Sequence, residues 1–271
     1  MAAIAAADVK KLRDATAAGM MECKKALEEA EGDFDKAIEV LRISGAAKAA
    51  KRGAERTTSN GVVLAKDGVL VEVLCETDFV AKGADFLAVA EKALDVAVAS
   101  GTRTTEELAA ATLDGGTVGA AVEALAAVIG EKIELGRVAA FEGDVAVYLH
   151  RRSPDLPPVV GVLVAYDGSE DVARGIAMQI AAMRPQYLSR EEVSAEVVET
   201  EKRIAEETAR NEGKPEQAMS KIIEGRVNSF YKDYCLVEQT SVTDPKMTVA
   251  QVLAAGNTTV RGFARVEVGG N

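Results

Sequence analysis

The hydrophobic period of the chain changes near residue 61, and this change limits the folds that the chain can adopt. Before it, apolar residues such as Val9 and Leu12 recur three or four positions apart, which is the spacing of one helix face. After it, residues 62–64 and 69–74 form two β-rich runs on either side of Asp67-Gly68. An Asp-Gly pair between two such runs predicts a β-hairpin. The chain is therefore expected to begin as helices and to continue as an α+β protein.

The first part of the chain, residues 1–54, is predicted to be an N-terminal three-helix bundle followed by a linker. The second and third helices carry apolar stripes at helical spacing. These stripes are Met20, Cys23, Leu27 and Ala30, and then Phe34, Ile38 and Leu41. Residues 46–56 contain Lys48, Lys51, Arg52 and Arg56 among alanines, and we interpret them as a solvated helical linker.

The remainder divides into two predicted subdomains with the same order of elements, residues 55–141 and 142–271. Each order is strand, strand, helix and strand, which suggests an internal duplication built on small antiparallel sheets. The predicted strands are 62–64, 69–74 and 133–141 in the first subdomain, and 145–149, 159–166 and 260–268 in the second. The predicted helices are 85–99, 118–129 and 171–183.

The second subdomain carries an insert at residues 189–235 that is rich in Glu, Lys, Arg and Ala. The Gly213-Lys214-Pro215 break separates two apolar stripes, so the insert is predicted to be an antiparallel helical hairpin resembling a short coiled coil. The stripes are Val193, Val197, Ile204 and Ala205, and then Ile222, Ile223, Val227, Phe230 and Tyr234.

Composition argues against several classes of function. The 271 residues carry a net charge of −11, whereas nucleic-acid binders usually present a basic face, so no direct nucleic-acid partner is expected. His150 is the one histidine, and the three cysteines are far apart, so neither a His-based triad nor a zinc site is expected. Phosphate-binding glycine motifs are absent. We therefore expect no enzyme activity, no cofactor and no metal.

The beginning of the chain and the lengths of its apolar runs bear on its location. Met1-Ala2-Ala3-Ile4 does not resemble the start of a signal peptide. The apolar runs are shorter than the roughly 18 residues that a membrane helix needs. We therefore expect a cytoplasmic protein without a membrane partner.

The strand-to-helix junction at Thr77, Asp78, Phe79 and Val80 has two interpretations. In the first, Thr77 or Asp78 caps the following helix and Phe79 packs beneath it. In the second, Phe79 is exposed on a loop that a strand and a helix hold in place, where binding residues often occur.

The chain closely resembles the bacterial elongation factor Ts family, and the resemblance follows the same order over nearly its whole length. The matching segments are 12–16, 19–21, 23–27, 44–46, 48–51, 77–81, 143–145, 196–198 and 262–263. For the fold, the resemblance implies a UBA-like N-terminal bundle. For function, it implies a guanine-nucleotide exchange factor that binds elongation factor Tu in its GDP-bound and nucleotide-free forms.

The resemblance also implies roles for particular residues. Thr77, Asp78, Phe79 and Val80 would disturb the Mg²⁺ site of the GTPase. Arg13, Met20, Met21 and His150 would form separate partner-binding contacts. Two other functions stay open from the residues alone: an RNA-associated scaffold that uses the basic linker, and an assembly scaffold, including a homodimer, that uses the helical hairpin.

Overall fold

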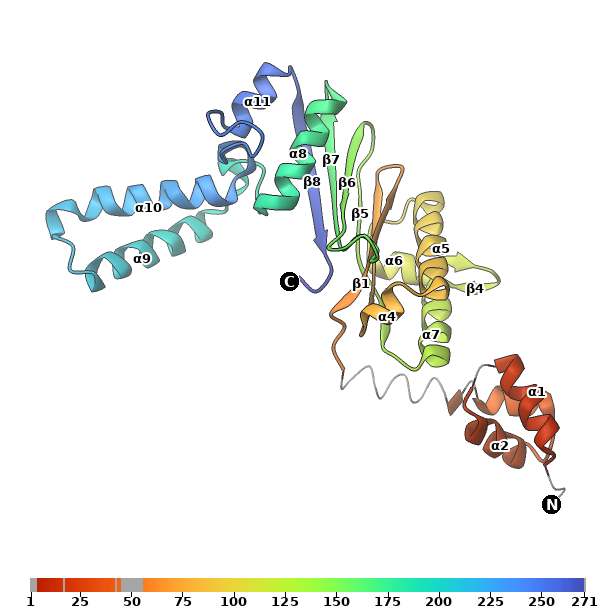
Figure 1. Ribbon diagram of the computed structural model, residues 1–271. Helices are drawn as coiled ribbons and strands as arrows, with labels where there is room; N and C mark the ends of the chain where they lie inside the picture. The colour runs from red at the N-terminus through yellow and green to blue at the C-terminus, as the bar shows by residue number, and fades with distance from the viewer. Residues whose placement is uncertain (1–3, 17, 42, 45–55, 271) are drawn as a thin grey trace. The chain divides into compact units, whose positions relative to one another are not determined.

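The computed structural model describes residues 4–16, 18–41, 43–44 and 56–270. It shows a mixed α/β chain with small antiparallel sheets (Figure 1). The chain forms two compact units: residues 1–140 with 151–159 and 266–271, and residues 141–150 with 160–265. The predicted basic linker lies outside the described residues, except for Arg56.

The N-terminal helices pack around a small core of their own. Helix α1 spans Ala6–Thr16, α2 spans Met20–Glu29, and a third helix covers residues 34–41. Leu12, Cys23 and Leu27 are fully buried between them. Met20, the first residue of the predicted stripe, is 56% exposed and lies outside this core. Side chains tilt toward the start of their helix, so the first residue of α2 projects beyond the packed turns.

The first sheet has the strand order β1-β2-β5. Strand β1 is Asn60–Lys66, β2 is Val69–Cys75 and β5 is Ile133–Ala140, and both pairings are antiparallel. Asp67 and Gly68 both have positive φ, 49° and 76°, as the predicted two-residue hairpin turn requires. Helix α5, Ala84–Ser100, contacts β1 and β2, and α7, Val118–Ile129, contacts β5. The hairpin and both helices were predicted from the sequence, to within one residue for the helices.

Short elements were not predicted because they contain too few residues to show a period. They are helix α4 at Asp78–Ala81, helix α6 at Thr105–Ala110, and strands β3 at Thr112–Leu113 and β4 at Gly116–Thr117. Helix α6 did have a sequence signal: Thr104 and Glu107 form a capping box.

The second sheet has the strand order β6-β7-β8 and repeats the arrangement of the first. Strands β6, β7 and β8 span Val145–His150, Val160–Asp167 and Thr259–Glu267. Helix α8, Glu170–Met183, follows the central strand as α5 does in the first unit, and it contacts β6 and β7. Helix α11, Val249–Ala255, was not predicted. An internal duplication stays an interpretation of this shared order.

Two contacting helices form the insert. Helix α9 is Ala195–Asn211 and α10 is Met219–Tyr234, and they lie side by side (Figure 1). Short 3-10 turns flank them at Arg190–Glu192, Glu216–Ala218 and Leu236–Glu238. The prediction for Ile204 is wrong: it is 46% exposed, while Ala205 and Ala209 are buried. Residues four apart share a helix face, so Ala205 and Ala209 face inward together and Ile204 does not.

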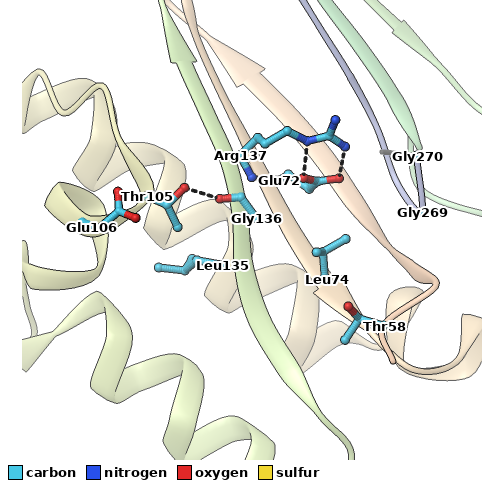
Figure 2. A pocket seen from close by; sticks show the side chains of 10 residues that line it. All are labelled: Thr58, Glu72, Leu74, Thr105, Glu106, Leu135, Gly136, Arg137, Gly269 and Gly270. Carbon is cyan, nitrogen blue, oxygen red and sulfur yellow. Dashed lines mark hydrogen bonds and ion pairs between the residues drawn. The ribbon is translucent and has the colours of Figure 1, made fainter. Parts of the chain in front are cut away.

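A buried carboxylate interrupts the regular ladder between β2 and β5. The register shifts between Val71 and Val73, and Glu72, 2% exposed, lies at the shift. The Arg137 guanidinium donates to both Glu72 oxygens, Nε to Oε2 at 2.9 Å and Nη2 to Oε1 at 3.0 Å, as Figure 2 shows. The Arg137 backbone N–H donates to Oε2 at 3.0 Å. The side-chain hydrogen bonds to Glu72 raise the pKa of the Arg137 guanidinium.

Removal of Arg137 should leave the Glu72 charge buried without its partner. We expect Arg137→Ala to lower the free energy of unfolding by about 2 kcal/mol, within the range for leaving a buried acceptor without its donor, because Glu72 is buried while Arg137 is 42% exposed. Urea denaturation of purified protein measures it. Arg152→Ala is the matched control, because Arg152 pairs with Glu267 at 3.7 Å and is 57% exposed, so no measurable change is expected. Equal losses in the two variants would contradict the role of the buried pair.

Candidate functional site: the tip between β2 and α5

The central strand β2 leads directly into the residues that the sequence singled out. Cys75, its last residue, is fully buried, and its thiol contacts the backbone oxygen of Thr77 at 3.2 Å. Helix α4 then makes a single turn, and Gly83 begins the approach to α5. We call Thr77, Asp78, Phe79 and Val80 the tip.

Thr77 is the N-cap of α4, as one of the two interpretations predicted. Its hydroxyl oxygen accepts from the backbone N–H of Val80 at 3.4 Å. The same hydroxyl donates to Glu131 Oε1 at 2.9 Å, and the Thr77 backbone N–H donates to Glu131 Oε2 at 3.2 Å. Glu131 follows Gly130, the C-cap of α7. The tip is thus tied to a residue 54 positions along the chain.

Glu76 makes a second set of contacts next to the hydrogen bonds between Thr77 and Glu131. Its carboxylate accepts from the backbone N–H of Lys132 at 2.5 Å and pairs with Arg56 at 3.1 Å. Its backbone oxygen accepts from the side-chain amide of Asn60 at 2.8 Å. Thr77, the first residue of the tip, and Glu76, the residue before it, are therefore both held by contacts with residues outside the tip.

The Phe79 side chain points away from the core. It is 74% exposed, while Ala81, two residues on, is 3% exposed. Val80 packs against the hydrophobic core of the first sheet. The Lys82 ammonium lies 4.6 Å from the centre of the Phe79 ring and 3.8 Å from the Asp78 carboxylate. The structure thus combines the predicted cap with an exposed Phe79, and the interpretation that places Phe79 beneath the helix is wrong.

The other predicted partner-binding residues lie on separate elements. Arg13, partly buried, is in the last turn of α1. Met20 and Met21 open α2 and are 56% and 66% exposed. His150 ends β6 and is exposed, with its Nδ1 3.4 Å from the Tyr148 hydroxyl. Arg13, Met20 and Met21 share the N-terminal helices, whereas His150 belongs to the second sheet.

Sites for a metal or a small ligand were sought in the same part of the chain. Among the described residues, His, Cys, Asp and Glu side chains form no group of three or more that could hold a metal ion. Cys23, Cys75 and Cys235 are buried and free of disulfides. A groove of about 450 Å³ lies over β2 and β5 (Figure 2), and two of its charged groups, Glu72 and Arg137, are bonded to each other. No helix in the described ranges is long and apolar enough to cross a membrane.

An exposed aromatic ring on a tightly held junction is suited to contact with another macromolecule, which is a feature of binding proteins as a class. Comparison with known proteins is consistent with this class. The family model described as elongation factor TS matches residues 76–270, which includes the tip. The chain belongs to the elongation factor Ts family, the members of which are translation elongation factors in protein biosynthesis.

Individual relatives match over almost the full length of both chains. An elongation factor Ts from a Nocardioides species is 61% identical over 269 residues, which is 99% of this chain and 100% of the relative. The Saccharopolyspora erythraea protein of the same name is 60% identical, with 99% of each chain covered. The Corynebacterium diphtheriae protein is 56% identical, with the same coverage.

The burial of Cys75 at the base of the tip gives a pH dependence. Burial raises the pKa of the Cys75 thiol to about 12 from its ordinary value near 9, and the neighbouring Glu131 carboxylate adds to the effect. As the pH rises, the Cys75 thiol loses its proton at a lower pH in the unfolded chain than in the folded protein. The contribution of the protonated thiol to the free energy of unfolding is therefore complete below pH 9 and is lost between pH 9 and 12.

We therefore expect Cys75→Ala to reduce the slope of unfolding free energy against pH above pH 9, by up to about 1.4 kcal/mol per pH unit. Urea denaturation at pH values from 8 to about 10.5 measures the slope. Val73→Ala truncates a buried neighbour that does not titrate, and its slope should match that of the unmodified protein. If the slope for Cys75→Ala also equals that of the unmodified protein, the pH dependence does not come from the Cys75 thiol.

Proposed function

We propose that this chain is the guanine-nucleotide exchange factor for elongation factor Tu. It binds the GDP-bound GTPase, speeds the release of GDP and holds the nucleotide-free form. The observation that carries the proposal is the Phe79 ring, 74% exposed on a junction whose neighbours Glu76 and Thr77 are fixed by hydrogen bonds. Membership of the elongation factor Ts family supports the choice of partner.

The proposed action of the tip is to disturb the Mg²⁺ site of the GTPase. Magnesium requires near-ideal octahedral geometry, so small displacements of its ligands or waters weaken its binding. Loss of the ion leaves the GDP phosphates without charge neutralisation. Phe79 enters as an apolar wedge, and Asp78, half-exposed beside it, brings a negative charge toward the metal side of the site.

Burial of the exposed Phe79 ring against the GTPase can supply a useful part of the free energy of binding. Burial of a Phe side chain contributes about 2 kcal/mol, which corresponds to about 30-fold in a dissociation constant. By linkage, the factor by which this protein weakens GDP equals the factor by which GDP weakens this protein. An exchange factor therefore needs contacts that hold the GTPase independently of the wedge.

The holding contacts are assigned to Arg13, Met20, Met21 and His150. Two adjacent exposed methionines form an adaptable apolar surface, because their side chains are flexible and polarisable. In this proposal the protein acts in the cytoplasm, needs no cofactor and makes or breaks no covalent bond.

Release of labelled GDP from elongation factor Tu tests the proposal directly. The unmodified protein should accelerate release, and no acceleration would refute exchange activity. Phe79→Ala should lower the maximal rate by about 30-fold, because the wedge is removed, while affinity for the nucleotide-free GTPase falls by less. Val128→Ala, at a 53% exposed apolar residue outside the tip, is the control and should leave both quantities unchanged. Equal losses of rate and affinity in Phe79→Ala would instead indicate a holding role.

For Met20 and Met21, which are assigned to holding contacts, we expect the reverse of the Phe79 result: a loss of affinity with little change in the maximal rate. Replacement of Met20 and Met21 together by Ala should weaken binding to the nucleotide-free GTPase by about 10-fold or more, since each removes apolar contact area. The maximal rate at saturating protein should stay within about twofold of the unmodified value. Met178→Ala, at a 42% exposed methionine of α8, is the matched control for an exposed methionine elsewhere. Unchanged affinity in the double variant would remove these residues from the interface.

A further inference from the structure

Helix α4 is too short to orient Phe79 by itself. It contains four residues, Asp78–Ala81. Isolated helices shorter than about 12 residues are marginal in water, because the first turn fixes several residues in return for a single hydrogen bond. The direction of the Phe79 ring therefore depends on what holds the turn from outside.

Glu131 holds the turn at its first residue. Its two carboxylate oxygens accept from the backbone N–H and the hydroxyl of Thr77, at 3.2 and 2.9 Å. Within the described residues, these bonds to Thr77 are the side-chain hydrogen bonds that Glu131 makes. Because its backbone N–H is fixed as well as its hydroxyl, Thr77 keeps both its position and its rotation.

Glu131 lies at a position where its negative charge does not stabilise α7, the helix that it follows. It follows Gly130, which ends α7 in the left-handed conformation with φ of 82°. A carboxylate near a helix C-terminus is unfavourable, since the helix dipole is negative there. The hydrogen bonds to Thr77 offset this cost, which indicates that the side chain serves the tip rather than α7.

We propose that Glu131 is a positioning residue of the exchange tip, which acts through Thr77 to hold Phe79 in the direction in which it enters the GTPase. The inference rests on the proposed exchange activity. It assigns to Glu131 no contact with the nucleotide or the metal of the partner. Its effect is on the rate at which bound GTPase loses GDP, and not on how tightly the GTPase is held.

The test measures two quantities for Glu131→Gln: the maximal rate of GDP release from elongation factor Tu at saturating protein, and the affinity for nucleotide-free elongation factor Tu. The Gln amide keeps one acceptor for Thr77 and loses the other. We expect the maximal rate to fall by about 10-fold, since misplacement of an acting group by about 1 Å can cost up to about 100-fold. Affinity should change by less than about threefold, because the holding contacts are elsewhere.

Glu134→Gln is the matched control. It makes the same change of charge at the start of β5, where Glu134 accepts from Thr58 at 2.6 Å and pairs with Lys132 at 3.2 Å, without touching the tip. Its maximal rate should equal that of the unmodified protein. An equal loss in both variants would mean that local charge, and not the bond to Thr77, sets the rate, and would overturn the inference.

A double-mutant cycle with Thr77 separates positioning from a general structural effect. Thr77→Val removes the hydroxyl bond to Glu131 and keeps the N–H bond, so Glu131→Gln should cost clearly less in that background than the roughly 10-fold it costs alone. Multiplicative losses would contradict the inference. A wild-type protein that does not accelerate GDP release would instead overturn the proposed function, and the inference with it.

Discussion

The hydrogen bonds that join residues 76–77 to residues 131–132 are the constraint on which the tip depends. They lie just past the end of the ladder between β2 and β5, the last pair of which is Cys75 opposite Ile133. Counting on from that pair sets Glu76 against Lys132 and Thr77 against Glu131, and in each case a glutamate side chain accepts from the backbone N–H of the facing residue. We infer that these contacts, rather than its own short helix, set the position of the exposed Phe79.

That register is set in the middle of the same ladder. Val71 pairs with Val138, but Val73 pairs with Leu135, so β5 has one residue more than β2 across the shift. Glu72 fills the irregularity and accepts the Arg137 N–H there. If β2 and β5 paired in one regular register without this bulge, Thr77 would lie opposite Lys132 instead of Glu131, because a slip of one residue moves every later pair. The Glu72–Arg137 ion pair at the bulge and the exposed tip are thus parts of one arrangement.

A rigid tip and an adaptable surface suit different parts of nucleotide exchange. A wedge must keep its direction against the resistance of the partner, whereas a holding contact gains from side chains that adjust. Phe79 is fixed by the sheet, and Met20 and Met21 are flexible side chains at the start of a helix. The two kinds of surface lie on different elements, so in the proposed exchange mechanism the wedge acts on the nucleotide site while other contacts hold the partner.

The sequence by itself determined the features that depend on residues near one another in the chain. The Asp67-Gly68 turn, the longer helices, a helix cap at Thr77 or Asp78 and the resemblance to the elongation factor Ts family all follow from local patterns. Only the tertiary structure decided that Phe79 and Met20 face outward, and that Glu131 holds Thr77. Burial depends on which elements pack against a residue, and Thr77 meets Glu131 across 54 positions through a sheet register that contains a bulge. Local periodicity carries no information about such distant partners.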